Sequence, residues 1–442
     1  MFDSLKLSAK LLSGRDRAVT RLVAACRQLL SEEGEASGAT RARETLALYA
    51  ALDATQRARF FDALKRDFSP RPEAVLEAAH AYAHEPSSLN LAVLTNVVEP
   101  PRQELLRRLN RTVGGTHAIV GMRVKLLDAL RRDHELTQVD DDFRHLLASW
   151  FNPGFLEMRR VDWHSPAALL EQVIQHEAVH EVRGWGDLRR RLQQDRRCFA
   201  FFHPAMPDEP LIFVEVALLP EMAQEIGPLI DANAAPGDLA DVKTAVFYSI
   251  SNCQPGLRGV SLGNFLIKRV VDTLQRDTPR VRTFCTLSPI PGFREWLKLR
   301  VAQGFVQDFR PGDKRLNDKL KKALSAVRAT LGEALGGSLA ELRANAAAIT
   351  GLKRELTTLC AAYLLGIGEA DAMPQDAVAR FHLNNGARLD RLNWAADDSD
   401  KGLRQSLGLM VNYVYEPRRI EHNHEQFARG RIAAGNAVTD LV

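Results

Sequence analysis

Two short segments of the chain carry residue types at a spacing that could support chemistry. The first, His176-Glu177-Ala178-Val179-His180, fits the HExxH pattern of zinc metallopeptidases. On a helix, two histidines four positions apart lie on one face and can bind Zn²⁺, while the glutamate activates a water molecule. The second segment, residues 256–264, contains three glycines and could hold an anion with its backbone amides. We weigh each against a structural alternative.

The HExxH pattern is a specific string, but its context does not favour a metal. It stands at the end of a predicted helix, and Gly184 and Trp185 follow closely, which indicates that the helix is ending. No obvious third ligand comes after it. We therefore interpret His176 as incidental, and we predict no metal site.

The glycine-containing segment is Gly256-Leu257-Arg258-Gly259-Val260-Ser261-Leu262-Gly263-Asn264. It lies between a predicted strand and a predicted helix, where consecutive N–H groups can face an anion and the helix dipole favours negative charge. It is a candidate cradle for a pyrophosphate group. Loops of this composition also serve only to turn a chain, so the spacing alone leaves both interpretations open.

The elements around this loop predict a mixed α and β region. Apolar runs at 198–203 and 211–219, joined by turn residues, predict an antiparallel hairpin, and residues 244–251 predict a third strand. The amphipathic pattern of 265–277 predicts a helix, and 282–288 a further strand. A strand, loop, helix, strand unit of this kind should be parallel and right-handed.

The N-terminal part of the chain has helical periodicity throughout. Apolar residues recur at helical spacing from 16 to 145, with a plausible cap at Asp53 and no convincing alternating strand. Helical character returns over 313–366. We predict a multidomain protein with an N-terminal helical bundle over 1–145 and a mixed α/β domain with added helices over 146–442. The predicted breaks between the first helices are Gly34 to Gly38, Ser69 to Pro72, Glu85 to Ser88, and Glu99 to Pro101.

Composition excludes several classes of protein. The 59 Lys and Arg residues against 55 Asp and Glu give a formal charge of +4 with the signs interspersed, which argues against a nucleic-acid-binding surface. No apolar run is long enough to cross a membrane, and residues 1–15 do not resemble a secretory signal. The five cysteines lack CxxC pairing, and the chain does not end in Ser-Lys-Leu. We expect a cytoplasmic location.

Several segments together resemble one enzyme family, the malonyl-CoA decarboxylases, in order and spacing. The loop itself is similar to the coenzyme A pyrophosphate motif of acetyltransferases, with Ser261 where a further glycine often stands. The family resemblance extends from about Phe151 to Tyr415. Its blocks are WHSP (163–166), EAVH (177–180), FYSIS (247–251), GVSLGNFLIKRV (259–270), LSPIPGF (287–293), FHLNNG (381–386), RLNW (391–394) and GLMVNY (408–413).

The resemblance implies a fold, a reaction and site residues. It implies a catalytic domain like that of the GNAT acyl-CoA-binding acetyltransferases, malonyl-CoA as substrate, and acetyl-CoA and CO2 as products. Ser288 would be the proton acceptor and carboxylate binder, and His382 the proton donor. The residues matching the family's substrate-binding segment are Arg258, Gly259, Val260, Ser261, Leu262, Gly263 and Asn264. It also implies a homo-oligomer, which we expect to form through the helical domain.

The reaction itself indicates what these residues must do. Loss of CO2 from a malonyl thioester leaves an enolate, so the site needs hydrogen-bond donors for the thioester oxygen and an acid for the carbon. No cofactor is expected, because the thioester carbonyl delocalises the charge and coenzyme A belongs to the substrate. Histidine, with an ordinary pKa near 6.5, suits the role of donor.

Other interpretations remain open from the residues alone. An acyltransferase of the GNAT type, or a malonyl-CoA sensor or scaffold without catalysis, could use the same loop and fold. A lone Ser before Pro, or a lone His beside an apolar run, is often structural. The sequence also leaves open the choice between malonyl-CoA and methylmalonyl-CoA, the subunit number, and any contribution from Asn384, Asn385, Asn393 and Glu215.

Overall fold

The computed structural model describes residues 2–31, 35–260, 262, 266–303, 309–310, 312–369 and 373–442. The chain divides into two compact units, which we describe separately. Unit 1 comprises residues 1–157, 202–210 and 254–262. Unit 2 comprises residues 158–201, 211–253 and 263–442. The predicted domain boundary after residue 145 stays a prediction.

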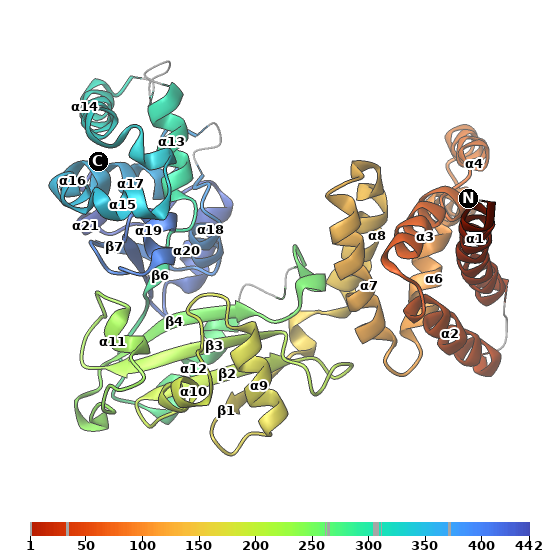
Figure 1. Ribbon diagram of the computed structural model, residues 1–442, viewed down its shortest axis with the longest axis horizontal. Coiled ribbons are helices and arrows are strands. Elements are labelled where there is room, and N and C mark those ends of the chain that lie inside the picture. The colour runs from red at the N-terminus through yellow and green to blue at the C-terminus, as the bar shows by residue number, and fades with distance from the viewer. Residues whose placement is uncertain are drawn as a thin grey trace. The chain divides into compact units, whose positions relative to one another are not determined.

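Unit 1 is built from helices, as the periodicity predicts (Figure 1). The predicted cap at Asp53 is confirmed: its carboxylate accepts the N–H of Gln56, whose side chain accepts the N–H of Asp53. Phe60 and Phe61 of the same helix are buried beside Tyr49. The elements are α1 (Phe2–Ser31), α2 (Glu35–Ala50), α3 (Ala54–Asp67), α4 (Pro72–His84), α5 (Ser88–Val98), α6 (Pro101–Asn110), α7 (Gly115–Leu130), η1 (His134–Leu136), α8 (Thr137–Trp150), η2 (Pro153–Phe155) and η4 (Pro255–Leu257).

Prolines mark the start of helices α4 and α6 in this unit. Pro72 and Pro101 each begin a helix, where the missing N–H costs nothing because the first-turn N–H groups have no partner within the helix. One predicted break is shorter than expected, since α2 already begins at Glu35 and therefore includes Gly38.

Unit 2 is organised around a mixed sheet with strand order β1-β2-β3-β4-β5-β8-β6, with β7 also paired to β8. The predicted hairpin and third strand are confirmed, because β2 pairs antiparallel with β3 and β3 with β4. The predicted parallel pairing is confirmed between β4 and β5, where Thr244 lies opposite Thr283. The strands are β1 (Glu157–Val161), β2 (Arg196–Phe202), β3 (Ile212–Leu219), β4 (Thr244–Asn252), β5 (Thr283–Thr286), β6 (Ser288–Pro289), β7 (Arg388–Asn393) and β8 (Met410–Tyr415).

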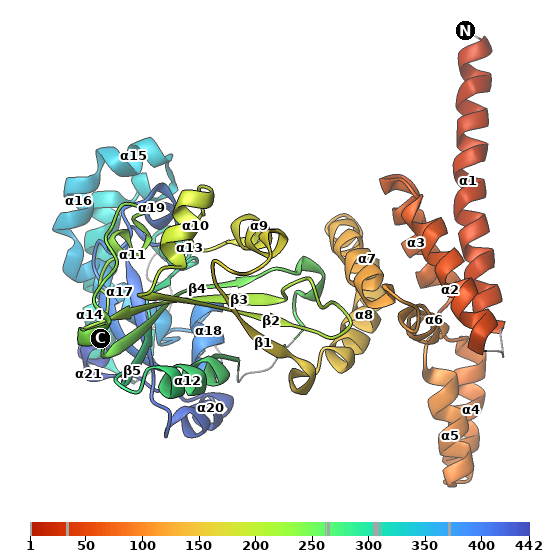
Figure 2. The same cartoon turned by 90° about the horizontal axis from the view of Figure 1, so that it is seen from below.

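Helices lie on both faces of this sheet (Figure 2). Glu215 of β3 is bonded to Arg191 of α10, whereas Arg269 of α12 lies over the ring of Phe201 of β2, which points to the opposite face. The helices are α9 (Ala167–His176), α10 (Trp185–Arg191), α11 (Gly227–Ile230), α12 (Leu266–Asp277), α13 (Phe293–Gln303), α14 (Lys314–Leu331), α15 (Leu339–Ala344), α16 (Ala346–Gly351), α17 (Lys353–Leu364), α18 (Ala377–Asn384), α19 (Asp400–Ser406), α20 (Ile420–Ala428) and α21 (Asn436–Thr439), with short turns η3 (Leu239–Asp241) and η5 (Ala334–Gly336).

Three strands, β1, β7 and β8, were not predicted from the sequence, and the last two bear on the site. β7 contains three charged residues, Arg388, Asp390 and Arg391, and its pattern does not resemble a buried strand. β8 is six residues long and buried throughout. Its Asn412 is an amide that strands usually disfavour. Both strands matter for the site, because β8 pairs with β5, β6 and β7.

Candidate functional site

Ser288 lies in the two-residue strand β6 and is 4% exposed. It pairs with Val411 of β8, and the preceding β5 pairs with the far end of β8 through Phe284 and Tyr415. Pro289 follows and favours the extended backbone that this pairing requires. One strand, β8, therefore fixes both sides of the turn that presents the Ser288 hydroxyl.

His382 lies on α18, is 3% exposed, and meets Ser288 across 94 positions of sequence. Its Nε2 is 3.0 Å from the Ser288 Oγ. On the other side of the ring, Nδ1 is 2.8 Å from the Tyr415 hydroxyl. The imidazole stacks on Tyr413 with ring centres 4.6 Å apart. The structure thus brings together the two residues that the family resemblance indicates.

The hydrogen bonds around the imidazole indicate which nitrogen carries the proton. Burial raises the pKa of Tyr415, so its phenol is protonated and its recorded partner is Nδ1. The Ser288 hydroxyl donates to Thr286 Oγ1 at 2.9 Å, which leaves its oxygen free to accept. We infer that Tyr415 donates to Nδ1 and that the proton of the neutral ring lies on Nε2, directed at Ser288.

Burial also changes the acidity expected from the sequence. His382 is enclosed by protein, and this desolvation lowers its pKa to about 3. The sequence-based expectation of an ordinary pKa near 6.5 is therefore wrong for the substrate-free protein. The imidazole is neutral at physiological pH, so the proton available for donation is the Nε2–H of a neutral ring.

Asp376 ties the Ser288 segment to the His382 helix. One carboxylate oxygen caps α18 by accepting the N–H groups of Val378 and Ala379, both at 2.9 Å. The other oxygen accepts the Gly292 N–H at 3.3 Å and the Tyr363 hydroxyl at 3.4 Å. Burial raises the pKa of this carboxyl group. A side chain at Gly292 would meet the Tyr363 hydroxyl at 2.3 Å, so this close approach requires glycine.

Asn412 holds the strands beneath the dyad. Its amide nitrogen donates to the carbonyls of Thr286 and Ala223 at 2.7 and 3.1 Å. Its oxygen accepts from Asn393 at 2.7 Å and from Arg391 at 3.2 Å. Asn393, whose role the sequence left open, thus contacts the strand network and not His382. Thr286 in turn accepts the N–H of Tyr413 at 3.1 Å.

The other residues whose roles the sequence left open form hydrogen bonds or ion pairs within the fold. The side chain of Asn385 donates to the carbonyl of Phe381 in the same helix, and the carbonyl of Asn384 lies 2.6 Å from His424 Nδ1. Glu215, whose contribution the sequence left open, does not face solvent. It is fully buried, bonded to Arg191 at 3.1 Å, and burial raises its pKa to about 8.

The predicted phosphate loop is held in unit 1 by a buried arginine. Arg123 of α7 donates from Nη1 to the carbonyls of Gly256 and Arg258, both at 2.8 Å, and pairs with Asp140 at 2.7 Å. Gly256 packs so closely on α7 that a side chain would meet the Val120 carbonyl at 2.2 Å. Gly259 has a positive φ of 76°. Ser261, Gly263 and Asn264 lie outside the described residues.

The HExxH string does not form a metal site. Helix α9 ends at His176, and Glu177 folds back so that its carboxylate accepts the N–H groups of Val179 and His180 at 2.7 and 2.8 Å. The two histidines are therefore not on one helical face. Across the described residues, no group of three His, Cys, Asp or Glu side chains could hold a metal ion.

Sequence reasoning missed four residues that surround the dyad. Tyr413 and Tyr415 stand two positions apart, which places both on one face of a strand, but the strand itself was not predicted. Asp376 precedes α18 in the position of a helix cap, a signal that was available. Thr286 lies two positions before Ser288 and gave no signal of its own.

Comparison with known protein families gives two matches. A family model for the malonyl-CoA decarboxylase C-terminal domain matches residues 154–442. A model for the malonyl-CoA decarboxylase N-terminal domain matches residues 68–151. The dyad lies in the first of these, and the helices α4 to α8 in the second.

Individual relatives agree with these matches. The mitochondrial malonyl-CoA decarboxylase of Anser anser anser is 35% identical over 395 residues, 85% of this chain and 77% of that protein. That of Rattus norvegicus is 37% identical over 72% of this chain and 65% of that protein, slightly under two thirds of its length. The crystal structure of malonyl-CoA decarboxylase from Rhodopseudomonas palustris has a TM-score of 0.85 and 45% identity, covering 96% of this chain and 99% of that one. The structure from Cupriavidus metallidurans has a TM-score of 0.74 and 35% identity, covering 96% and 100% of the two chains.

The neutral, buried state of His382 can be tested by its titration. We expect its ring nitrogens to show no change of protonation state from pH 8 to pH 5 in ¹⁵N NMR, because the pKa is lowered to about 3. In the unfolded chain His382 binds a proton below about pH 6.5, whereas in the folded protein it stays neutral. The free energy of unfolding should therefore fall by about 1.4 kcal/mol for each pH unit below about pH 6.5. A His382→Gln protein should lack this pH dependence of stability. Its spectrum also identifies the His382 resonances, because they are missing from it.

Tyr415→Phe serves as the companion variant for that experiment. It removes the donor to Nδ1 and leaves the ring buried, so the proton should redistribute between the nitrogens while the ring stays neutral. An imidazole that titrates between pH 5 and 8 in the wild-type protein would contradict the assignment.

Proposed function

This chain belongs to the malonyl-CoA decarboxylase family and is a decarboxylase, and we propose that it releases CO2 from malonyl-CoA through Ser288 and His382. One observation carries the proposal: two polar side chains from distant segments, both almost fully buried, lie 3.0 Å apart. Buried polar groups normally have hydrogen-bond partners in the fold. Here the two partners are the Nε2–H of His382 and the hydroxyl of Ser288, which lie beside each other. That pair can act on a carboxylate and on the carbanion it leaves.

The burial of the dyad supports decarboxylation directly. A carboxylate loses hydration when it enters a site as enclosed as that of Ser288 and His382, whereas neutral CO2 loses little. The bond between the carboxyl carbon and the α carbon breaks, and its electron pair passes into the thioester enolate. Movement of negative charge from the carboxylate into the enolate is favoured where water does not stabilise the carboxylate.

We assign Ser288 to the carboxylate. Its hydroxyl donates to Thr286 in the free protein and can exchange that hydrogen bond for one to a substrate oxygen, so its proton keeps an acceptor. The rigid turn between β5 and β6 fixes the position of the oxygen. A donor preorganised in this way is worth about 3 kcal/mol where charge develops.

We assign His382 as the acid that protonates the α carbon. Nε2 carries the proton and faces Ser288, while Tyr415 holds Nδ1 and Tyr413 covers one face of the ring. The carbon takes one proton for each CO2 released. His382 must therefore recover a proton before the next turnover. No metal or organic cofactor is needed in this scheme, since the thioester carbonyl receives the electron pair.

We propose that the loop from Arg258 to Asn264 binds the coenzyme A part of the substrate. Arg123 fixes the carbonyls of Gly256 and Arg258, so the beginning of the loop is held before substrate arrives. The Arg258 side chain is exposed and available for a phosphate. Preorganisation of this kind lowers the entropic cost of binding.

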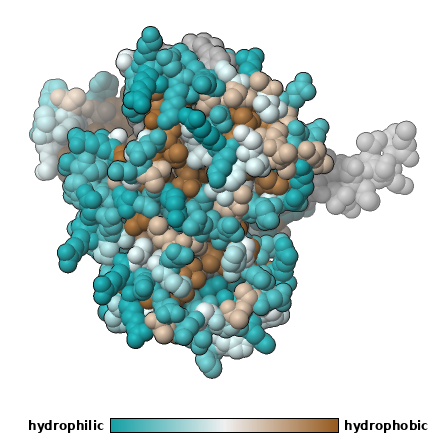
Figure 3. All heavy atoms as spheres, turned by 90° about the vertical axis from the view of Figure 1, so that its left-hand side faces the viewer, coloured by the Kyte–Doolittle hydropathy of each residue, from teal (hydrophilic) through white to brown (hydrophobic). Residues whose placement is uncertain are grey.

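We also propose that the helical unit carries self-association. Helix α5 has no buried residue, yet most of its residues are apolar. Leu89 is 72% exposed, and Leu91, Val93 and Val98 are each nearly half exposed. On the face of unit 2 shown in Figure 3, hydrophobic residues form only small separate patches. An apolar helix surface of this kind is typical of an interface, and we propose a second copy of the chain as its partner.

Location in the cell stays a prediction. The described residues include no helix long and apolar enough to cross a membrane. The relatives from goose and rat are named mitochondrial. We retain the cytoplasm as the proposed location of this chain.

Substitution of the dyad tests the proposed chemistry. Ser288→Ala and His382→Ala should each lower kcat for release of acetyl-CoA and CO2 by about 10²-fold or more, because each removes a donor that acts in the transition state. Products should be followed by mass spectrometry, with and without an acceptor amine, which also detects acyl transfer.

Ser406→Ala is the matched control, since Ser406 is a buried serine of unit 2 whose hydroxyl bonds to the carbonyls of Gly402 and Leu409. It should keep kcat within about twofold. Undiminished turnover by the Ser288 or His382 variant, with normal folding, would refute that residue's role.

A loop variant tests the substrate assignment separately. Arg258→Gln should raise KM for malonyl-CoA by about tenfold and leave kcat nearly unchanged, because it removes a charged contact to a part of the substrate that does not react. Arg131→Gln is the control, an arginine of the same unit with a 75% exposed side chain. A fall in kcat at constant KM would place Arg258 at the reacting end instead.

The oligomer proposal predicts a change of mass. Leu89→Glu with Val93→Glu should dissociate the assembly in sedimentation velocity, because two charges on α5 are costly to bury between copies. Lys353→Glu, an exposed charge change in unit 2, should leave the mass unchanged. An assembly that survives the α5 substitutions with normal helicity would exclude this surface.

A further inference from the structure

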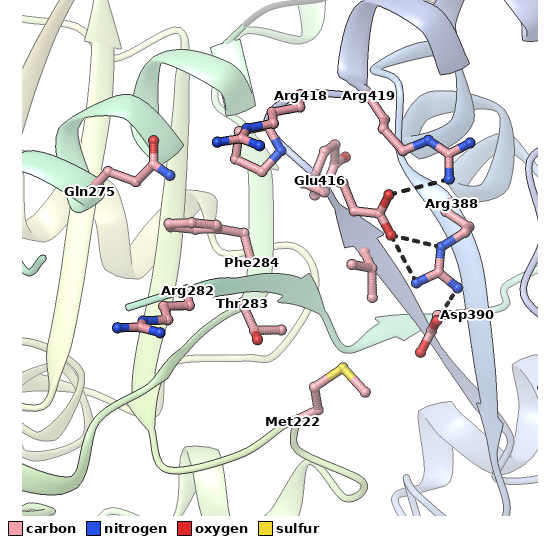
Figure 4. A pocket seen from close by; sticks show the side chains of 13 residues that line it. Met222, Gln275, Arg282, Thr283, Phe284, Arg388, Asp390, Glu416, Arg418 and Arg419 are labelled. Atoms are coloured by element: carbon pink, nitrogen blue, oxygen red, sulfur yellow. Dashed lines mark hydrogen bonds and ion pairs between the residues drawn. The ribbon is translucent and has the colours of Figure 1, made fainter. Parts of the chain in front are cut away.

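A groove in unit 2 lies where β5 begins and β8 ends, and neither the dyad nor the proposed coenzyme A loop uses it (Figure 4). It has a volume of about 660 Å³, within the range of small-molecule sites. Its lining includes Met222, Phe284 and Val414, which supply apolar surface. The remaining lining is dominated by charged side chains. We call this feature the β5–β8 groove.

Positive charge exceeds negative charge in the β5–β8 groove. Its lining holds four arginines and two carboxylates, which leaves an excess of two positive charges. The arginines are Arg282, Arg388, Arg418 and Arg419, and the carboxylates are Asp390 and Glu416.

The charges are not all neutralised within the protein. Arg388 lies between Asp390 and Glu416, and Arg419 reaches Glu416 only at 3.8 Å. Within the described part of the chain, neither Arg282 nor Arg418 forms an ion pair, and Figure 4 shows both side chains at the groove. Two guanidinium groups are therefore available to a ligand.

A helix begins at the same place. Helix α20 is nine residues long and starts at Ile420, directly after the groove residues Pro417 to Arg419. The N-terminal end of a helix carries partial positive charge, and this adds to the field of the arginines. The apolar surface of Met222 and Phe284 lies at the same groove and could contact an uncharged part of a ligand.

We propose that the β5–β8 groove binds a small phosphate ester with an apolar moiety, at a site separate from the substrate's. A phosphate monoester carries nearly two negative charges and several acceptor oxygens, which matches the excess of two positive charges and the guanidinium donors that line the groove. Guanidinium groups bind phosphate in a bidentate manner that lysine does not reproduce. The apolar lining favours an ester over inorganic phosphate.

The site adjoins the catalytic residues through the chain itself. Glu416, which Arg388 and Arg419 hold, directly follows Tyr415, whose hydroxyl bonds to His382. A bound phosphate would compete with Glu416 for these arginines. The groove is thus placed to bind an effector next to a residue that positions the acid.

Binding of defined probes tests the proposal. Adenosine 5′-monophosphate and inorganic phosphate should bind the wild-type protein in calorimetry at low salt, the ester more tightly, and adenosine should not bind measurably. Arg282→Gln with Arg418→Gln should weaken binding of the monophosphate by about tenfold or more, because two charge-assisted contacts are lost. The exposed Arg276→Gln should not change it.

Further variants separate this site from the proposed substrate site. Arg258→Gln should leave binding of the monophosphate unchanged, and the double variant should leave KM for malonyl-CoA unchanged. Failure of any probe to bind, unchanged affinity in the double variant, or equal binding of citrate would overturn the proposal. A raised KM for malonyl-CoA in the double variant would assign the groove to the substrate and would also overturn it.

Discussion

The hydrogen bond between Ser288 and His382 is the contact on which the rest of the catalytic unit depends. It joins a two-residue strand to a helix 94 positions later, so neither segment can fix it alone. Strand β8 lies between them: it pairs with Ser288 at one end and supplies Tyr413 and Tyr415 to the imidazole. Asp376 adds a second tie from the His382 helix to the loop after Ser288. The dyad is thus positioned from both sides.

Buried polar side chains fix irregular backbone in both units. Arg123 holds the carbonyls of the glycine loop in unit 1, and Arg191 holds those of His180 and Glu181 in unit 2. Each arginine also pairs with a buried carboxylate, Asp140 and Glu215 respectively. Removal of one partner would leave a buried charge uncompensated, so these pairs contribute to geometry more than to net stability. Loops that must approach a ligand can in this way be held without regular secondary structure.

Sequence patterns predicted the elements that are marked by the residues within them. The hairpin of β2 and β3, the parallel pairing of β4 and β5, and the cap at Asp53 follow from alternation, helical period and capping chemistry. The family resemblance identified Ser288 and His382, which no local pattern distinguishes. Strands β7 and β8 could not be predicted, because Arg388 and Asn412 are stabilised by partners from distant segments. In the HExxH string, helix α9 ends at His176 and Glu177 accepts the N–H groups of Val179 and His180, so the two histidines do not share a helical face.

The pKa of His382 shows why such a site cannot be judged from residue types alone. Exposed histidine exchanges its proton near neutral pH, but enclosure by Tyr413, Tyr415 and α18 lowers its pKa to about 3. In the mechanism that we propose, the same enclosure would raise the energy of a substrate carboxylate, and the departure of CO2 would remove that cost. The negative charge of the enolate would then face the Nε2–H where charges interact strongly, and the proton would move toward it. Under this proposal, the burial that makes His382 a poor base in the free protein favours both bond cleavage and proton donation.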